Sequence, residues 1–271
     1  MPLITSRAHP FFKQLIKLGK STRTRKKTGQ TLLDGLHLIQ AYHTALGLPE
    51  SLIICQSAQE CSEIKDFLKK IKKYPTINIA TLSDSLYQKV SPVKTPTGIM
   101  ARINIPKLKT IATNRTIPFC VMLEAIQDPG NLGSILRSAA AAGASEIYLS
   151  HDCTDAWAPK TLRAAMGAHF LLRIYERSNL LAVAQQFKGQ LITTSPQARK
   201  SLYQTQLTGP VAFIFGNEGT GLSDEVFRLA NEQITIPMPG KTESLNAAAA
   251  AAVCFFERVR QCMIASTDSA T

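Results

Sequence analysis

The sequence predicts an α/β protein of two domains: a small N-terminal α/β domain followed by a larger domain built on a parallel sheet. Short apolar runs alternate with helical stretches along most of the chain. From residue 119 onward the runs are apolar almost throughout, as is typical of parallel strands covered on both faces. A polar, proline-bounded stretch at residues 106–117 lacks periodicity and is interpreted as a linker.

The first domain is assigned to residues 1–105. Apolar side chains between residues 32 and 46, and again between 64 and 71, follow helical spacing. Strands are predicted for the apolar runs at residues 52–55, 77–80 and 98–103. These elements are expected to form one small α/β domain.

The second domain is assigned to residues 118–265, with a tail at 266–271. Six apolar runs predict its strands, at residues 119–123, 146–150, 170–175, 190–195, 211–215 and 233–237. Helical stretches are expected between them, at residues 131–143, 159–167, 178–188, 223–230 and 244–262. Parallel sheets bind ligands in the loops after the carboxyl ends of their strands, so the candidate sites lie there.

Charge is distributed unevenly along the chain. Lys and Arg number 31 and Asp and Glu 19, which gives a formal net charge of +12. Residues 1–105 hold sixteen basic and six acidic side chains, whereas the remaining residues are nearly neutral. This excess predicts a polyanionic partner that meets the N-terminal domain first. Candidate contacts are Arg23, Arg25, Lys26 and Lys27.

Several classes of protein are disfavoured by composition. The six cysteines include no pair two or three residues apart and the five histidines have no ligand spacing, so no metal site is predicted. No apolar run reaches the roughly 18 residues that a membrane-spanning helix requires. We therefore expect a soluble cytoplasmic protein.

The first candidate loop, residues 124–133, follows the strand that ends at Leu123. Pro129 and Gly130 suit a tight turn, and Asn131 is either a helix N-cap or a ligand-facing residue. Arg137 lies nearly two turns into the following helix, where it is either a surface arginine or part of a site.

The second and third loops carry glycines and polar residues. Gly216, Gly219 and Gly221 have a spacing that departs from both the dinucleotide fingerprint and the phosphate loop, and Glu218 among them is a candidate ligand-facing carboxylate. In the third loop, residues 236–246, Ser244 is a plausible N-cap for an alanine-rich helix with Asn246 in its first turn. That helix is suited to close packing, in the core or against a second subunit.

Taken in this order, the three loops resemble the three motifs of the SpoU/TrmH family of RNA ribose 2′-O-methyltransferases. The matching residues are Asn131, Gly133, Arg137 and Gly143 in the first motif, Gly216, Glu218, Gly221 and Leu222 in the second, and Ile236, Pro237, Met238, Gly240, Ser244, Leu245 and Asn246 in the third. The N-terminal run RTRKKTGQTLLDGLHLI resembles the family's substrate-binding domain, whose fold is like that of ribosomal protein L30e.

The resemblance implies S-adenosylmethionine as methyl donor, a SPOUT-type parallel sheet with a deep trefoil knot, and a homodimer formed through the catalytic domain. It implies that backbone groups at Gly216, Ile236 and Leu245 hold the donor. It also implies a reaction site lined by Asn131, Arg137, Glu218, Ser244 and Asn246. Relatives with this two-domain layout mostly act on large-subunit ribosomal RNA, so 23S ribosomal RNA is the expected substrate.

Methyl transfer requires the ribose 2′-oxygen to lie in line with the donor methyl, so positioning and charge stabilisation should supply most of the rate. The family's arginine is often described as helping to deprotonate the hydroxyl. A guanidinium keeps its proton at a pKa above about 12, so our hypothesis is that Arg137 stabilises charge while phosphate or water takes the proton. Ala247 and Ala248 stand where relatives often have Val-Ser, and Ala165 stands where serine is frequent, which affects substrate details only.

Three alternatives remain open on the sequence. A tRNA 2′-O-methyltransferase and a catalytically silent RNA-binding or ribosome-assembly protein would share the motifs or the fold. A dinucleotide-binding enzyme would share the glycine-rich loop but has no use for the basic N-terminal domain. Binding of the methyl donor distinguishes the methyltransferases from the other two.

Overall fold

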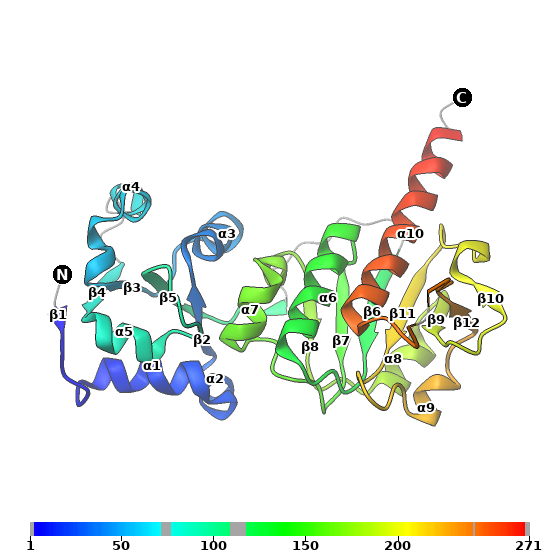
Figure 1. The fold of residues 1–271 in the computed structure, drawn as a ribbon, viewed down its shortest axis with the longest axis horizontal. Helices are drawn as coiled ribbons and strands as arrows, with labels where there is room; N and C mark the ends of the chain where they lie inside the picture. Colours follow the sequence, from blue (N-terminus) through cyan, green and yellow to red (C-terminus); the bar gives the residue numbers. More distant parts are fainter. Residues whose placement is uncertain (1–2, 72–76, 109–117, 241, 269–271) are drawn as a thin grey trace. The chain divides into compact units, whose positions relative to one another are not determined.

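The computed structural model describes residues 3–71, 77–108, 118–240 and 242–268, and the chain divides into two compact units (Figure 1). The first unit holds the chain up to Lys107 together with Trp157–Phe170, and the second holds Leu108–Ala156 and the chain from Leu171 onward. Most of the predicted linker at 106–117 lies outside the described residues.

The first unit is a five-stranded mixed sheet with helices on both faces. The sheet has the order β1-β4-β3-β5-β2, in which β1, β4 and β3 run parallel while β5 is antiparallel to both β3 and β2. The elements are β1 (Leu3–Ile4), α1 (Pro10–Lys20), α2 (Thr22–Thr28), β2 (Gln30–Asp34), α3 (Leu36–Leu46), β3 (Ser51–Cys55), the 3-10 turn η1 (Ser57–Glu60), α4 (Ser62–Ile71), β4 (Asn78–Leu82), α5 (Asp84–Val90) and β5 (Ile99–Asn104).

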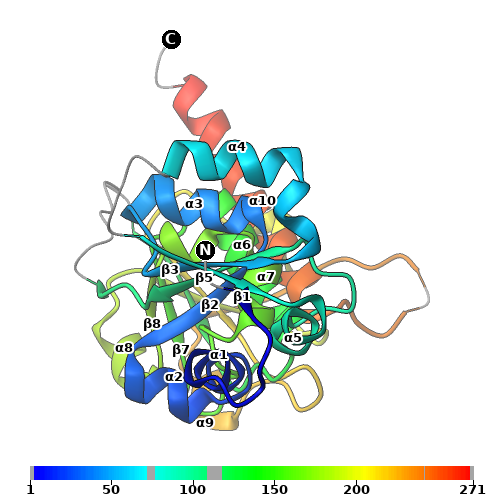
Figure 2. The same cartoon turned by 90° about the vertical axis from the view of Figure 1, so that its left-hand side faces the viewer.

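Apolar periodicity explains how these helices pack. Helix α1 buries Phe12, Leu15 and Leu18 against α5 and one face of the sheet, and keeps its lysines outside. Figures 1 and 2 show α1, α2 and α5 on this face and α3 and α4 on the other. The predicted strands at 52–55, 77–80 and 98–103 are confirmed within two residues at each end.

One prediction in this unit is wrong. Leu32 and Leu33 match the helical spacing of the residues that follow them, but they lie in β2, paired with β5. Gly35, with φ of 103°, separates β2 from α3, so the chain changes direction between Leu33 and Leu36. The helical pattern arose because a buried strand and the next helix each present leucines to the core.

A segment from the second half of the chain completes the first unit. Trp157–Phe170, which contains α7 (Pro159–Ala165) and the 3-10 turn η3 (Ala168–Phe170), packs against β2 and α3. The Thr31 hydroxyl donates to the Trp157 carbonyl (2.6 Å), and the Arg163 guanidinium donates to the Asp34 carboxylate (2.9 Å). The helix predicted at 159–167 is therefore present, but it is packed within the N-terminal unit.

The second unit is a seven-stranded parallel sheet, which confirms the predicted class. Its order is β10-β12-β9-β11-β6-β7-β8, and every neighbouring pair is parallel. The elements are β6 (Phe119–Leu123), α6 (Pro129–Ala142), β7 (Glu146–Leu149), β8 (Arg173–Tyr175), α8 (Leu180–Gln186), β9 (Gln190–Thr194), β10 (Lys200–Ser201), the 3-10 turn η4 (Leu202–Gln204), β11 (Val211–Phe215), α9 (Asp224–Phe227), β12 (Glu232–Thr235) and α10 (Ala247–Asp268).

Both faces of the central strands are buried. On one face the rings of Phe119, Phe213 and Phe215 meet Phe255 of α10, with centroid separations of 5.6 to 5.8 Å. Helices α6 and α10 pack against each other on this side (Figure 1). Alternate residues of the same strands face α8 and α9; this cluster comprises Cys120, Met122, Leu180, Ala184, Leu191, Ala212, Ile214 and Val226. Burial on both faces explains why the strands read as continuous apolar runs.

Several segments of this unit differ from prediction, and the short strand β10 was not predicted. The predicted strand at 170–175 is only Arg173–Tyr175, because Phe170 belongs to η3. Helix α10 continues to Asp268, three residues into the predicted tail at 266–271. No helix within the described parts of the chain is long and apolar enough to span a membrane. The knot that the resemblance implies stays a prediction.

The ion pair between Arg163 and Asp34 predicts a pH-dependent contribution to stability. Burial raises the pKa of Asp34, while the Arg163 charge opposes that rise. Arg163→Ala should therefore lower the free energy of unfolding of the first unit by about 3 kcal/mol near pH 7, because it leaves a buried carboxylate unpaired. The loss of stability should shrink near pH 5. Because the pKa of Asp34 is raised, its carboxyl becomes protonated more readily as the pH falls, and a neutral carboxyl needs no cationic partner.

Trp157, the only tryptophan of the chain, is 6% exposed in this segment, so its fluorescence during urea denaturation reports on the unit. The matched control is the double variant Asp34→Asn with Arg163→Ala, which removes the unpaired charge and should recover part of the loss. Equal losses at both pH values would contradict the assignment.

Candidate active site

Loops from four neighbouring strands meet at one edge of the second sheet. Because β12, β9, β11 and β6 are adjacent and parallel, the residues that follow them lie side by side at their carboxyl ends. These loops contain all three motifs singled out in the sequence, together with Thr194–Pro196 after β9.

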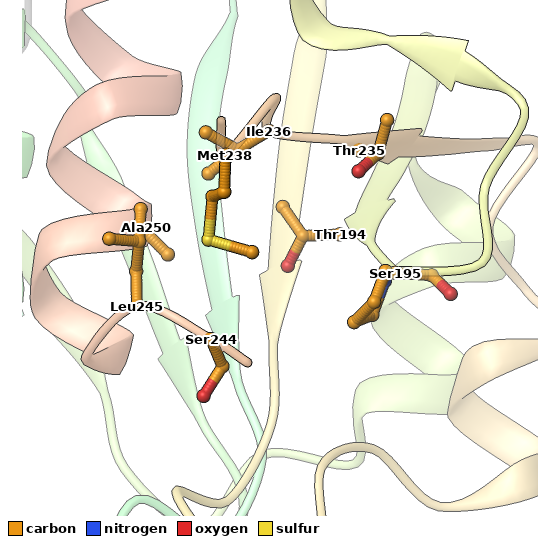
Figure 3. Close-up of a pocket in the computed structure, with 9 residues that line it drawn as sticks. Thr194, Ser195, Thr235, Ile236, Met238, Ser244, Leu245 and Ala250 are labelled. Atoms are coloured by element: carbon orange, nitrogen blue, oxygen red, sulfur yellow. The ribbon is translucent and has the colours of Figure 1, made fainter. Parts of the chain in front are cut away.

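Two adjoining cavities lie among these loops. The first, of about 140 Å³, is lined by Thr194, Ser195, Pro196, Thr235, Ile236, Met238, Ser244, Leu245 and Ala250. Figure 3 shows the Met238 side chain between Leu245 and Ala250 on one side and Thr194 on the other. The second, of about 340 Å³, is lined by Thr193, Thr194, Phe215, Gly216, Asn217, Glu218, Gly221, Leu222, Ser244, Leu245, Asn246, Ala247 and Ala250. The two cavities adjoin, since Thr194, Ser244, Leu245 and Ala250 line both.

A chain of hydrogen bonds joins the three motifs. The Glu218 carboxylate accepts from the Asn131 amide (2.9 Å), and the Asn131 carbonyl oxygen accepts from the Asn246 amide (2.9 Å). The Asn246 Oδ1 atom in turn accepts from the backbone N–H groups of Ala248 (2.9 Å) and Ala249 (3.4 Å). A carboxylate only accepts and a backbone N–H only donates. The two ends of this series of hydrogen bonds therefore require the same orientation of the Asn131 and Asn246 amides.

Glu218 is held as an anion. Burial alone would raise its pKa, but hydrogen bonds from Asn131 and from the backbone N–H groups of Gln127 and Asp128 (both 3.2 Å) bring the pKa below its usual value. A carboxylate with a lowered pKa is a poor proton acceptor. Glu218 therefore anchors the neighbouring loop and is unsuited to act as a general base.

The capping interpretation of Asn131 is wrong. Helix α6 begins at Pro129, and its N-cap is Asp128, whose carboxylate accepts from the Asn131 backbone N–H (2.8 Å). The Asn131 side chain is thereby left to bridge Glu218 and Asn246. Asp128 was missed because an asparagine three residues later is an equally good cap in sequence.

Helix α10 shows the reverse exchange of roles. Its first residue is Ala247, and the Asn246 side chain caps it through Ala248 and Ala249. The predicted N-cap, Ser244, lies outside the helix and lines both cavities. Asn246 thus combines a capping role with its contact to Asn131.

The three residues expected to hold a donor all line the site. Gly216 borders the larger cavity, Ile236 the smaller one and Leu245 both. A Cβ atom at Gly216 would overlap the backbone of Gly221 and Leu222, so this position requires glycine. Sequence analysis missed Thr194, Ser195 and Pro196, since no glycine or charged residue marks the end of β9.

Arg137 stands apart from these residues. Its side chain is exposed on α6 and lines neither cavity. It has no hydrogen bond or ion pair within the part of the chain that the structure describes. A single copy of the protein therefore brings together Asn131, Glu218, Ser244 and Asn246, but leaves Arg137 outside this group.

The basic residues singled out in the first unit divide into two kinds. Arg23, Lys26 and Lys27 are exposed on α2. Arg25 is only 3% exposed, and its guanidinium donates to the Leu18 carbonyl (2.7 Å) and the Thr22 hydroxyl (3.0 Å). Arg25 therefore links α2 to α1 and is not placed to contact a phosphate. Its inward orientation could not be predicted, because in sequence it stands among exposed basic residues.

The fold and site define an α/β protein with a pair of cavities at the carboxyl edge of a parallel sheet, which is where such folds bind small ligands. The family model described as the SpoU rRNA Methylase family matches residues 118–256, and an MRM3-like substrate-binding domain matches residues 9–101. The chain belongs to the SpoU rRNA methylase family.

Relatives cover nearly the whole chain. An uncharacterized tRNA/rRNA methyltransferase of Synechocystis sp. is 35% identical over 97% of this chain and 96% of its own length. The 23S rRNA (guanosine(2553)-2′-O)-methyltransferase RlmP of Bacillus subtilis is 29% identical over 90% of this chain and 95% of its own.

Solved structures share the two-unit architecture. A crystal structure of an RNA 2′-O ribose methyltransferase, 28% identical, matches 96% of this chain and 98% of its own with a TM-score of 0.81. An AdoMet-bound rRNA methyltransferase from Sinorhizobium meliloti, 25% identical, matches 95% of this chain and 97% of its own with a TM-score of 0.79.

Glu218→Gln tests the anchoring role, because it keeps the shape of the side chain but removes its charge. Amide hydrogen exchange at Gln127 and Asp128 should accelerate about fivefold near pH 7, as expected for the loss of about 1 kcal/mol of charge-assisted hydrogen bonding. Because the pKa of Glu218 is lowered in the folded protein, its carboxylate stabilises the fold at pH values above the ordinary pKa of a glutamate. The difference in amide exchange between the wild type and the variant should disappear as the pH falls through the pKa that Glu218 has in the folded protein.

Glu225→Gln is the matched control, since it removes an exposed carboxylate from α9 in the same unit. Exchange at Gln127 and Asp128 should then equal that of the wild type. An acceleration that does not diminish as the pH falls through the titration of Glu218 would show that the charge of Glu218 is not its cause.

Proposed function

We propose that the protein is an RNA 2′-O-ribose methyltransferase that uses S-adenosylmethionine and acts on 23S ribosomal RNA. The observation that carries the proposal is the convergence of the three SpoU motifs on one pair of cavities through the Glu218–Asn131–Asn246 chain. The names of RlmP and of the AdoMet-bound structure support the reaction and the donor.

The cavities fit S-adenosylmethionine, which supplies a methyl group on a positively charged sulfur. Ile236, Met238 and Leu245 offer apolar side chains to the donor, and Gly216, Ile236 and Leu245 would hold its polar groups through their backbone. Among the described residues that line the two cavities, none is cationic, and Glu218 contributes an anion. This charge distribution favours a cationic ligand over a phosphate or a dinucleotide.

The polar residues then take distinct roles. Asn131, Glu218 and Asn246 satisfy one another, so they hold the loops in register and position the ribose. Ser244, which lines both cavities, would hydrogen-bond the 2′-oxygen through its hydroxyl. Arg137 keeps its proton and would stabilise the nearby phosphate or the developing alkoxide.

We also propose a homodimer formed through the second unit. Phe256, Met263 and Ile264 of α10 are 49%, 66% and 50% exposed, an unusual apolar exposure for one helix. Arg137 lies on α6, which packs beside α10. A second copy packed on these helices would cover the apolar residues and give Arg137 a route to a donor cavity, its own or the partner's.

The first unit supplies an RNA-binding surface. Lys13, Lys17 and Lys20 are exposed on α1 at helical spacing, opposite its buried face. The exposed cations of α2 continue this surface, and no acidic residue occurs in the first 29 positions. Cations that no carboxylate neutralises bind a polyanionic backbone with strong salt dependence.

Titration calorimetry with S-adenosylmethionine, S-adenosylhomocysteine and a dinucleotide tests the proposed function. Saturable binding of the first two only is expected. Arg137→Ala should keep donor affinity within about threefold but slow methyl transfer to 23S ribosomal RNA about 100-fold or more, because it removes charge stabilisation from the transition state.

Arg228→Ala, which removes an exposed arginine from the neighbourhood of α9, is the matched control and should retain the wild-type rate. Absence of donor binding at millimolar concentration would leave a silent RNA-binding protein as the better description. Loss of donor binding in the Arg137 variant would assign that residue to cofactor support.

The basic surface predicts the salt dependence of RNA binding. Replacing Lys13, Lys17 and Lys20 together with glutamine should reduce the slope of log affinity against log salt by about 2 to 3, at about 0.7 to 0.9 per lost phosphate contact. Electrophoretic mobility shift at several salt concentrations measures the slope, and donor affinity should stay unchanged.

Helix α4 provides a charge-matched control in the same unit. Lys65 pairs with Glu60 and Lys69 with Asp66, so glutamine at Lys65, Lys69 and Lys70 should leave the slope near that of the wild type. Equal reductions from the two triple variants would show that only net charge matters and would reject the α1 surface as a site.

A further inference from the structure

The loops after β6 and β11 are tied together by residues to which the motif comparison assigns no role. The Glu124 carboxylate accepts two hydrogen bonds from Ser223, one from its backbone N–H and one from its hydroxyl, both of 2.7 Å. The Asn217 amide donates to the Ala125 carbonyl (2.8 Å). These two ties lie at opposite ends of residues 216–223, which we call the glycine loop.

Asn217 also shapes the glycine loop from within. Its side-chain oxygen accepts from the backbone N–H groups of Gly219 (2.8 Å) and Thr220 (3.1 Å), while its backbone pairs with that of Gly221 in both directions. Only an amide serves here, because one side chain must donate to a carbonyl and accept from two N–H groups. Aspartate would face the Ala125 carbonyl with an anion.

The partner loop is itself fixed. Ala125 has a left-handed backbone, with φ of 53°, which costs a non-glycine residue energy and persists only where the surroundings hold it. Its N–H donates to the Ser150 hydroxyl (2.9 Å), and the Glu124 N–H donates to the Phe215 carbonyl (2.9 Å). The loop after β6 is therefore a rigid support for the glycine loop.

We propose that Glu124 and Asn217 are positioning residues that hold the glycine loop in its donor-binding shape. The inference rests on the proposed function. Gly216, Asn217, Gly221 and Leu222 line the larger cavity, whereas Glu124 and Ser223 line neither. Glu124 therefore acts on the ligand only through the loop, while Asn217 both shapes the loop and borders the cavity, so hydrogen exchange without donor is the test of its positioning role. Glu124 should affect donor affinity and leave the methyl-transfer step unchanged, the opposite of the effect expected for Arg137.

The test compares Glu124→Ala, Glu124→Gln and Asn217→Asp with the wild type. Calorimetry with S-adenosylmethionine and S-adenosylhomocysteine should show a Kd about tenfold higher for Glu124→Ala and Asn217→Asp. Glutamine at position 124 keeps an acceptor and should restore affinity to within about threefold. The KM for the donor should follow the Kd, while kcat at saturating donor stays within about twofold.

Asn179→Asp is the matched control for the asparagine variant. This residue caps α8 through its side-chain oxygen and lines neither cavity, so donor affinity should not change. Thermal unfolding of each variant is measured in parallel. A Kd shift in a variant whose unfolding temperature equals that of the wild type cannot come from general destabilisation.

Amide hydrogen exchange of the ligand-free protein gives a readout that does not depend on the donor. Exchange at residues 219–223 should accelerate about fivefold or more in Glu124→Ala and Asn217→Asp. Unchanged exchange together with an unchanged Kd would overturn the inference, as would a loss of kcat at constant Kd. If the wild type fails to bind any donor, the proposed function fails, and the exchange experiment still decides whether the two residues hold the loop.

Discussion

The amide of Asn131 is the contact on which the site depends. It is the middle member of a chain whose ends are a carboxylate that only accepts and two backbone N–H groups that only donate. Each motif therefore requires the other two: Glu218 orients Asn131, Asn131 orients Asn246, and Asn246 sets the start of α10. Asn131 and Asn246, which are 115 positions apart in the chain, belong to one hydrogen-bond network. Removing any member of such a network leaves its neighbours without a partner, which is costly.

The two units present different charges to their expected ligands. The first presents exposed cations on α1 and α2, namely Lys13, Lys17, Lys20, Arg23, Lys26 and Lys27. The second places an anion and no cation, among its described lining residues, around the cavities. A polyanion is attracted to the first unit and a cationic donor to the second, so the two ligands do not compete for the same charges. Arg137, the cation that the first motif contributes, is exposed on α6 and lines neither cavity of its own chain.

Much of this fold could be predicted because its strands are buried on both faces. Residues 211–215 and 119–123 are apolar throughout, and both strands lie where the pattern placed them. Local rules failed where two residues competed for one role: Asp128 and Asn131 are equivalent caps in sequence, and only the position of Glu218 decides between them. Arg25 looked like its basic neighbours because the direction of a side chain on a short helix depends on the packing of α1.

The placement of Trp157–Phe170 separates folding units from chain order. The N-terminal unit includes a piece of the connection between β7 and β8, which accepts a hydrogen bond from the Thr31 hydroxyl and donates one to Oδ2 of Asp34. During synthesis, this unit cannot reach its final packing until about 170 residues have left the ribosome. Chimeras that join units from two relatives at the linker would likewise pair one parent's β2 with the other parent's α7, so compatible exchange requires moving both segments together.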